Sequence, residues 1–220
     1  MKISVILTGS TGMVGEGVLH ECLLHPDIEK VLVINRHPCQ ILNPKLSELI
    51  QTDFFDLTTI ENLLVGYHAC FYCLGSTSIK MKEFEYYNVT YTLTLSVAQR
   101  LAKLNPEMTF CYISGAGVDD TEKAKFMQAR VKGKTEADLM KLAFKKVYCF
   151  RPGLLKPTGG LKNTHKIYYV LTPIYPILRL MFPNFVLTLK ELGIAMINSV
   201  TKDYEKQILE VNDIVKLSKL

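Results

Sequence analysis

The sequence predicts an α/β fold: a doubly wound parallel sheet that carries helices on both faces. Short apolar segments rich in β-branched residues alternate with segments of helical periodicity from the first residues to Phe150. These strand-like segments are continuously apolar, which is typical of parallel strands covered on both faces. The 220 residues, of which 48% are hydrophobic, suffice for one domain with a sizeable core.

Six apolar segments are predicted to be strands and four segments to be helices before Phe150. The strands are Ile3–Thr8, Val31–Asn35, Leu46–Thr52, Ala69–Leu74, Met108–Ile113 and Val147–Phe150. A first helix follows Thr8, because Val14, Val18 and Cys22 recur at helical spacing until His25-Pro26. A short helix over Leu57–Leu64 and long helices over Phe84–Leu104 and Lys123–Phe144 complete this part.

The regular alternation ends after Arg151. Here the sequence predicts a Pro/Gly-rich loop, a proline-interrupted apolar segment, a helix, a last strand and a terminal helix capped by Asp213. In order, the first four are Leu154–Gly160, Lys166–Phe182, Leu189–Val200 and Gln207–Val211. We expect residues 1–220 to form one domain, in which about 151–205 supply a small C-terminal substrate-binding portion.

Charge and cysteine content indicate which class of partner and which cellular compartment to expect. The net charge is +5, and residues 139–190 hold nine Lys or Arg and no Asp or Glu. This asymmetry favours an anionic partner, although solvated lysines on helix faces explain it equally simply. Cys70 and Cys73 lie three apart on a strand and therefore point to opposite faces, so we predict no metal site. Without a signal peptide or transmembrane segment, a cytoplasmic location is expected.

The strongest motif is the glycine-rich turn between the first strand and the first helix. Gly9, Gly12 and Gly15 have the spacing that permits a tight turn, close approach of a pyrophosphate and close helix packing. The phosphates then meet unpaired N–H groups at the positive end of the helix. The sequence therefore predicts a dinucleotide site of the Rossmann type. Its predicted contacts are Gly9, Ser10, Thr11, Gly12, Met13, Val14 and Gly15.

The end of the second strand indicates which dinucleotide is bound. NAD-preferring sites usually place an acidic residue there against the ribose 2′-hydroxyl. This chain has Asn35 and Arg36 instead, and a guanidinium can bind a 2′-phosphate. We therefore expect NADP(H), with NAD less favoured. The alternative is that Arg36 is only a solvated cation at a strand end.

These residues resemble the atypical short-chain dehydrogenase/reductases, and most closely a Tat-interacting, oxidoreductase-like group related to the epimerase/dehydratases. The resemblance covers nearly the whole chain and rests on TGSTGMVG, NRHP, CLGST, YNVTYTLTLSVAQ, YISGAG, VKGKTE and FRPGLLKP. It implies further cofactor contacts at Asp53, Phe54, Cys73, Leu74, Gly75, Pro152, Gly153 and Leu154. It also implies catalytic positions at Asn88, at Ser114 as the substrate-polarising hydroxyl, and at Lys132, which grips the nicotinamide ribose.

One position departs from the family pattern. The superfamily's acid/base is a tyrosine four residues before the lysine, so that both lie on one helix face. In this chain Gln128 stands four residues before Lys132, and a glutamine amide cannot act as an acid or base. The usual catalytic tyrosine is therefore lacking at that position.

Three functions remain open from the sequence. The first is hydride transfer from NADPH to an apolar or planar acceptor, such as a quinone or flavin, that needs little help from a protein acid. The second is an epimerase- or dehydratase-like reaction, and the third is a catalytically silent dinucleotide-binding sensor or interaction protein. An aromatic and aliphatic wall within 168–182, beside several cations, suits a small apolar molecule with an anionic end. The same wall also suits ordinary core or a homo-oligomer contact. No nucleic-acid recognition motif accompanies the charge.

Overall fold

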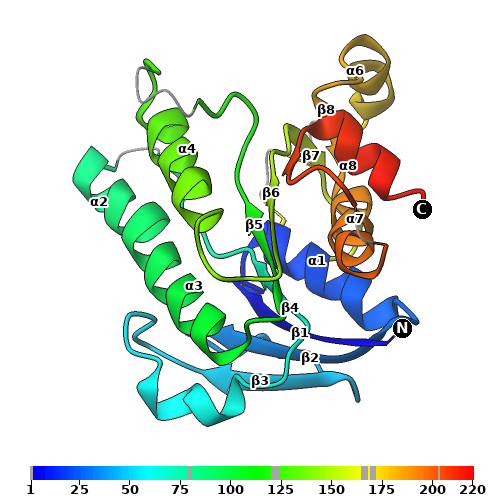
Figure 1. Ribbon diagram of the computed structural model, residues 1–220. Coiled ribbons are helices and arrows are strands. Elements are labelled where there is room, and N and C mark those ends of the chain that lie inside the picture. The colour runs from blue at the N-terminus through cyan, green and yellow to red at the C-terminus, as the bar shows by residue number, and fades with distance from the viewer. Residues whose placement is uncertain (1, 79–80, 120–123, 165–167, 169–171, 203) are drawn as a thin grey trace.

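The computed structural model describes residues 2–78, 81–119, 124–164, 168, 172–202 and 204–220. Its centre is a seven-stranded sheet in the order β3-β2-β1-β4-β5-β6-β9, in which every pairing is parallel (Figure 1). The strands are β1 Ile3–Thr8, β2 Ile28–Asn35, β3 Leu46–Ile50, β4 Ala69–Tyr72, β5 Thr109–Ile113, β6 Lys146–Phe150 and β9 Ile208–Leu209. The chain reverses its direction of travel across the sheet between β1 and β4, which confirms the doubly wound prediction.

Helices cover both faces of this sheet. One face carries α1 (Met13–Leu24), α7 (Leu189–Thr201) and α8 (Val211–Leu217), and the other carries α2 (Glu83–Tyr87), α3 (Leu93–Leu104) and α4 (Met127–Leu139) (Figure 1). Alternating side chains of β1 explain the two layers, since Val5 and Leu7 enter the α1 core while Ile6 enters the α3 core.

Glycines let α1 and α7 pack closely. A Cβ at Gly17 would lie 2.1 Å from the Leu189 side chain, and one at Gly193 would lie 2.8 Å from the side chain of Glu21. The pair of helices therefore forms a tight layer directly behind the glycine-rich turn that precedes α1.

Several element predictions need correction. The helix expected over Phe84–Leu104 is interrupted by a π turn, η2, at Asn88–Thr92, where the Leu93 N–H bonds to the Asn88 carbonyl. The helix expected over Lys123–Phe144 is shorter, because α4 ends at Leu139; Lys123 lies outside the described residues. The segment expected as helix over Leu57–Leu64 is a 3₁₀ turn, η1, at Thr58–Leu63.

The C-terminal portion also differs from its prediction. Leu154–Lys156, expected within a loop, is strand β7, and it pairs in parallel with β8 (Val186–Thr188). The cap of α8 is Glu210 rather than Asp213, whose carboxylate instead accepts from the Glu210 N–H at 3.3 Å. β7 is defined by pairing with a strand distant in the sequence, whereas the cap of α8 is a local contact whose starting residue was misplaced by three positions.

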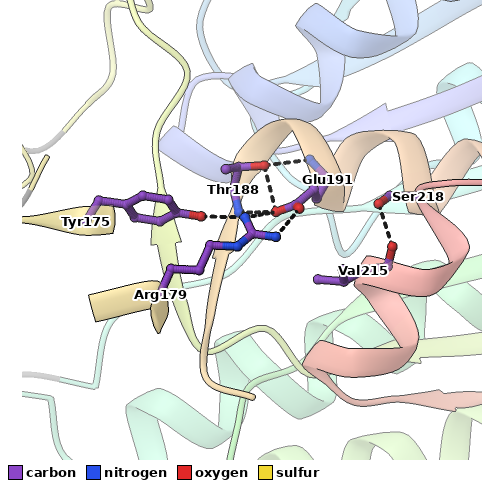
Figure 2. A network of polar contacts seen from close by, with 6 residues as sticks. All are labelled: Tyr175, Arg179, Thr188, Glu191, Val215 and Ser218. Carbon is purple, nitrogen blue, oxygen red and sulfur yellow. Dashed lines mark hydrogen bonds and ion pairs between the residues drawn. The ribbon is translucent and has the colours of Figure 1, made fainter. Parts of the chain in front are cut away.

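A polar network joins two helices within this portion. Arg179 of α6 (Tyr175–Met181) donates two hydrogen bonds to the Glu191 carboxylate, at 2.5 and 2.9 Å, and a third to the Tyr175 hydroxyl (Figure 2). Glu191 also accepts from the Thr188 N–H and forms the capping box of α7. As a result α6 is tied to the N-terminus of α7.

Candidate functional site

The glycine-rich turn lies at the carboxyl edge of the sheet, where β1 and β4 end. Gly9 adopts φ +75°, and a Cβ at this position would lie 2.7 Å from the Cys73 carbonyl oxygen. Only glycine satisfies both constraints, because L side chains rarely adopt this backbone conformation. The turn thus packs directly against the backbone of Cys73 and Leu74. This is the point where the strand order reverses, and doubly wound sheets bind their ligands in a crevice there.

The other two glycines of the turn differ in what surrounds them. A Cβ at Gly15 would lie 2.1 Å from the Gly9 carbonyl oxygen, so Gly15 is required by helix packing. A Cβ at Gly12 would meet nothing closer than 3.5 Å, so the protein itself does not require glycine there. Gly12 is also the N-cap of α1 and provides no side-chain hydrogen bond to the helix. The space beside Gly12 and the uncapped N–H groups fit a phosphate.

Asn35, at the end of β2, is occupied in supporting this turn. Its buried amide is hydrogen-bonded to the Ser10 hydroxyl and donates to the Glu48 carboxylate at 2.8 Å. Burial alone would raise the pKa of Glu48, but the hydrogen bonds from Cys39 and Asn35 together lower it. Glu48 is therefore an ionised carboxylate that holds Asn35, and Asn35 holds Ser10.

Arg36 is exposed next to this network. Within the described part of the chain no carboxylate lies within ion-pair distance of its guanidinium. Of the other predicted adenine contacts, Asp53 is exposed and accepts from the Phe55 N–H at 2.8 Å, whereas Phe54 is only 5% exposed and packs into the core. The ring of Phe54 is therefore mainly part of the hydrophobic core.

A cavity of about 650 Å³ lies beyond the ends of β4 and β5, and it brings together part of the predicted catalytic set. Gln128 and Lys132 of α4 line it, together with Ser78, Tyr86, Gly115 and Phe126. The Gln128 amide donates to the Ser78 hydroxyl. Ser114 lies next to this wall; it is 3% exposed, and its hydroxyl has no hydrogen-bond partner among the described residues. Sequence reasoning missed Tyr86 and Ser78, which come from outside the family motifs.

Lys132 is held over the end of β5. Its Nζ donates to the Ser114 carbonyl at 2.6 Å. Burial lowers the pKa of Lys132 to about 8, and the nearby Glu136 carboxylate opposes this shift. The ammonium group is therefore a cation at neutral pH with part of its hydration removed.

The predicted contacts after β6 close one side of the site. The Pro152 carbonyl accepts from the Ala116 N–H at 3.0 Å, which fixes this segment beside the Gly115 wall of the cavity. A Cβ at Gly153 would lie 2.1 Å from the Phe185 carbonyl oxygen, and the Leu154 N–H bonds to the same oxygen at 2.8 Å. Asn88, by contrast, does not line the cavity; its amide oxygen accepts from the Thr92 hydroxyl at 3.5 Å.

Residues 5–135 match the model of the NAD-dependent epimerase/dehydratase family. The chain belongs to this family. The match begins in β1 and ends in α4, so it includes the glycine-rich turn, Ser114, Gln128 and Lys132.

The sequence of this epimerase/dehydratase family member is similar to those of named proteins from other organisms. Protein fmp52, mitochondrial, of Emericella nidulans is 27% identical over 69% of this chain, and the match spans 66% of the relative, slightly under two thirds of its length. Protein HTATIP2 of Rattus norvegicus is 28% identical over 83% of this chain and 81% of the relative. The cytoplasmic location expected for this family member stays a prediction.

The fold of this family member matches solved enzymes. The Bordetella bronchiseptica enzyme WbmF, solved in complex with NAD⁺, superposes with a TM-score of 0.67 at 14% identity, covering 99% of this chain and 77% of WbmF. At this identity the match bears on the fold alone.

The C-terminal wall of this family member is only partly built as expected. Tyr168, Tyr175 and Leu178 line cavities beside Lys156. The other described apolar members of the wall are exposed, namely Ile174, Ile177, Leu180, Met181 and Phe182. Tyr169, Val170 and Leu171 lie outside the described residues. Among the described residues, no helix is both long and apolar enough to cross a bilayer, and no three His, Cys, Asp or Glu residues cluster as metal ligands.

The buried cation gives a prediction for stability. Because folding lowers the pKa of Lys132 to about 8, the unfolded chain binds more protons than the folded one between that value and the ordinary lysine pKa. Lys132 therefore opposes folding most strongly below pH 8, and this cost disappears as the pH rises. Lys132→Met should stabilise the fold at pH 7 by about 1–3 kcal/mol, and by less at pH 10, in urea unfolding.

The neighbouring Lys134 provides the control. Its ammonium group is 3.0 Å from the Asp138 carboxylate at the helix surface, so Lys134→Met should change stability by less than about 1 kcal/mol. A Lys132→Met variant that is less stable than the wild type at pH 7 would show that the bond to the Ser114 carbonyl outweighs the desolvation of the ammonium.

Proposed function

We propose that this protein is an NADP(H)-dependent oxidoreductase that transfers hydride to a small apolar or planar acceptor. The observation that carries the proposal is the phosphate cradle at α1, where Gly12 leaves open space and the helix N-terminus has no side-chain cap. Membership of the epimerase/dehydratase family supports a nicotinamide dinucleotide as the ligand, and WbmF, with the same fold, was solved with NAD⁺.

The residues after β2 support the phosphorylated cofactor. Asn35 is neutral and directed to Ser10, so no carboxylate at this position competes for the ribose hydroxyls. The exposed Arg36 is available to form a charge-assisted hydrogen bond to a 2′-phosphate. Glu48 lies nearby, but its carboxylate is bonded to the Asn35 amide and the Cys39 N–H.

The bound dinucleotide would supply the hydride. On the side of the protein, the Ser114 hydroxyl is a buried donor without a partner among the described residues, and Lys132 provides a cation next to it. These two groups would orient an acceptor oxygen and stabilise the charge that develops on it. The aromatic side chains of Phe126 and Tyr86 in the same cavity suit a planar acceptor.

Thermal unfolding with each cofactor tests the proposal. NADPH at about a hundred times its Kd should stabilise the fold by about 2.7 kcal/mol, and by more than NADH at equal concentration. Arg36→Ala should remove the difference by losing about 1.5–3 kcal/mol of charge-assisted hydrogen bonding. The control is Lys30→Ala, on the same strand but before its carboxyl end, which should keep the preference. Equal or greater stabilisation of the wild type by NADH would refute the assignment of the 2′-phosphate to Arg36.

A further inference from the structure

Tyr86 contributes a phenol to the cavity in which the family's usual tyrosine is replaced by Gln128. It belongs to α2, whereas Gln128 and Lys132 belong to α4, and all three line the same space. Tyr86 is only 2% exposed, so it is packed into the wall of the cavity rather than surrounded by bulk solvent. Because Tyr86 lies on a different helix from Lys132, the family's fixed tyrosine-to-lysine spacing does not predict it.

The chemistry of the cavity wall singles out this residue. Among the described residues that line the cavity, Tyr86 and Lys132 alone have side chains that titrate in the usual pH range. Gln128 donates its amide to Ser78 and has no proton to exchange. Within the described lining, the groups able to give a proton to a ligand in this space are therefore Tyr86 and Lys132.

The local structure around Tyr86 is unusual for a helix. The π turn of Asn88–Thr92 begins two residues after it, and such turns occur often at functional sites. Burial raises the pKa of Tyr86, an effect that the Thr90 hydroxyl partly offsets, so the phenol keeps its proton at neutral pH. Lys132, a cation at neutral pH, lines the same cavity.

We propose that Tyr86 is the proton donor of this site and takes the role that the residue four positions before Lys132 has lost. The proposal rests on the function proposed above. In the step it describes, the carbonyl carbon of the acceptor receives hydride from the reduced nicotinamide, and the C=O π electrons move to oxygen. That oxygen takes the proton of the Tyr86 hydroxyl, and the phenolate regains a proton from solvent. The acceptor is reduced to an alcohol, and the dinucleotide is oxidised by two electrons.

The substrate class follows from the presence of a donor. A carbonyl compound gives a localised alkoxide and needs a positioned acid, which contributes about 10²–10⁴-fold to the rate. A quinone spreads the incoming charge over its ring and needs this help much less. With Tyr86 as donor, the protein should reduce apolar aldehydes and ketones as well as quinones.

Matched tyrosine variants test this role. Tyr86→Phe should lower NADPH-dependent reduction of an aromatic ketone by about 10²–10⁴-fold while lowering quinone reduction much less, and it should leave the Kd for NADPH nearly unchanged. The control is Tyr87→Phe, because the Tyr87 ring stacks on Tyr91 at 4.7 Å between centroids and does not line the cavity. Adding Gln128→Tyr to Tyr86→Phe would restore a phenol one turn before Lys132 and should recover part of the ketone rate.

A spectroscopic readout tests the same role without turnover. In the protein labelled with ¹³C-tyrosine, the Tyr86 resonance is the one that disappears in Tyr86→Phe. It should shift when NADP⁺ is added and again when Lys132 is changed to Met, whereas the Tyr87 resonance should stay in place.

The outcomes separate the two proposals. If NADPH binds and quinones are reduced, but Tyr86→Phe leaves the ratio of ketone to quinone rates unchanged, Tyr86 is not the donor and the proposed oxidoreductase function survives. Tyr86 is likewise not the donor, and the oxidoreductase function survives, if the wild type reduces quinones but no ketone. The same conclusion follows if the Tyr86 resonance shifts neither with NADP⁺ nor with Lys132→Met. A wild type that binds NADPH and reduces no acceptor overturns both proposals.

Discussion

Gly12→Val should abolish binding of NADPH while leaving the protein folded. Apart from its chain neighbours, the nearest protein atom to the added Cβ would be the Gly9 carbonyl oxygen at 3.5 Å, so the fold should tolerate it. The branched side chain would instead occupy the space at the N-terminus of α1 in which the pyrophosphate is expected. Isothermal titration should show at least a hundredfold weaker binding, and the thermal stabilisation by NADPH should vanish. The unliganded variant should unfold within a few degrees of the wild type.

The third glycine of the turn is the matched control. Gly15→Ala adds a Cβ only 2.1 Å from the Gly9 carbonyl oxygen, which is backbone and cannot rotate away. We expect this smaller substitution to lower the free energy of unfolding by about 1–3 kcal/mol or more. Gly12 would then be required by the ligand and Gly15 by the fold. A folded Gly12→Val variant that binds NADPH normally would remove the phosphate-binding role of the turn.

The order of the main elements could be predicted because each is encoded locally. β1, α1 and β2 each follow from apolar periodicity within a few turns, and their bounds lie close to those expected. The π turn at Asn88 leaves no such trace, since its residues fit a regular helix equally well. β7 was missed because three residues between Gly153 and Pro157 become a strand only by pairing with β8, far along the chain.

The candidate site likewise has parts that the local sequence specifies and parts that depend on contacts distant in the sequence. The glycine-rich turn is contiguous in sequence, so its residue types and spacing specify its geometry directly. The partners of that turn are not contiguous: Glu16 accepts from the backbone N–H groups of Lys162 and Asn163 at 2.9 and 2.7 Å, and this contact pins the segment after β7 to α1. The placement of Tyr86 in the cavity opposite α4 likewise depends on helix packing.

Beneath the site, a buried ion pair joins the helix that carries Lys132 to the strand that leads into Pro152. Arg151 donates from Nε to Glu136 Oε1 at 3.0 Å and from a terminal nitrogen to Oε2 at 2.5 Å, and it also contacts Glu210 at 3.1 Å. The Glu136 side chain is 3% exposed and that of Arg151 14%. Neither charge can easily recover its hydration if the other is removed.

Arg151→Met should therefore cost about 3–5 kcal/mol of unfolding free energy at neutral pH, because it leaves the Glu136 carboxylate buried without its partner. For a chain of this size, that loss lowers the melting temperature by about 10 °C, which calorimetry can measure. The double variant Arg151→Met/Glu136→Leu removes both charges and should recover most of the loss. Arg100→Met is the surface control: the Arg100 and Glu61 side chains are 40% and 31% exposed, so its cost should stay below about 1 kcal/mol. If Arg151→Met and Arg100→Met lowered the unfolding free energy equally little, water would have to reach the Glu136 carboxylate in the folded protein. The ion pair between Arg151 and Glu136 could then not be what holds α4 and its Lys132 against β6.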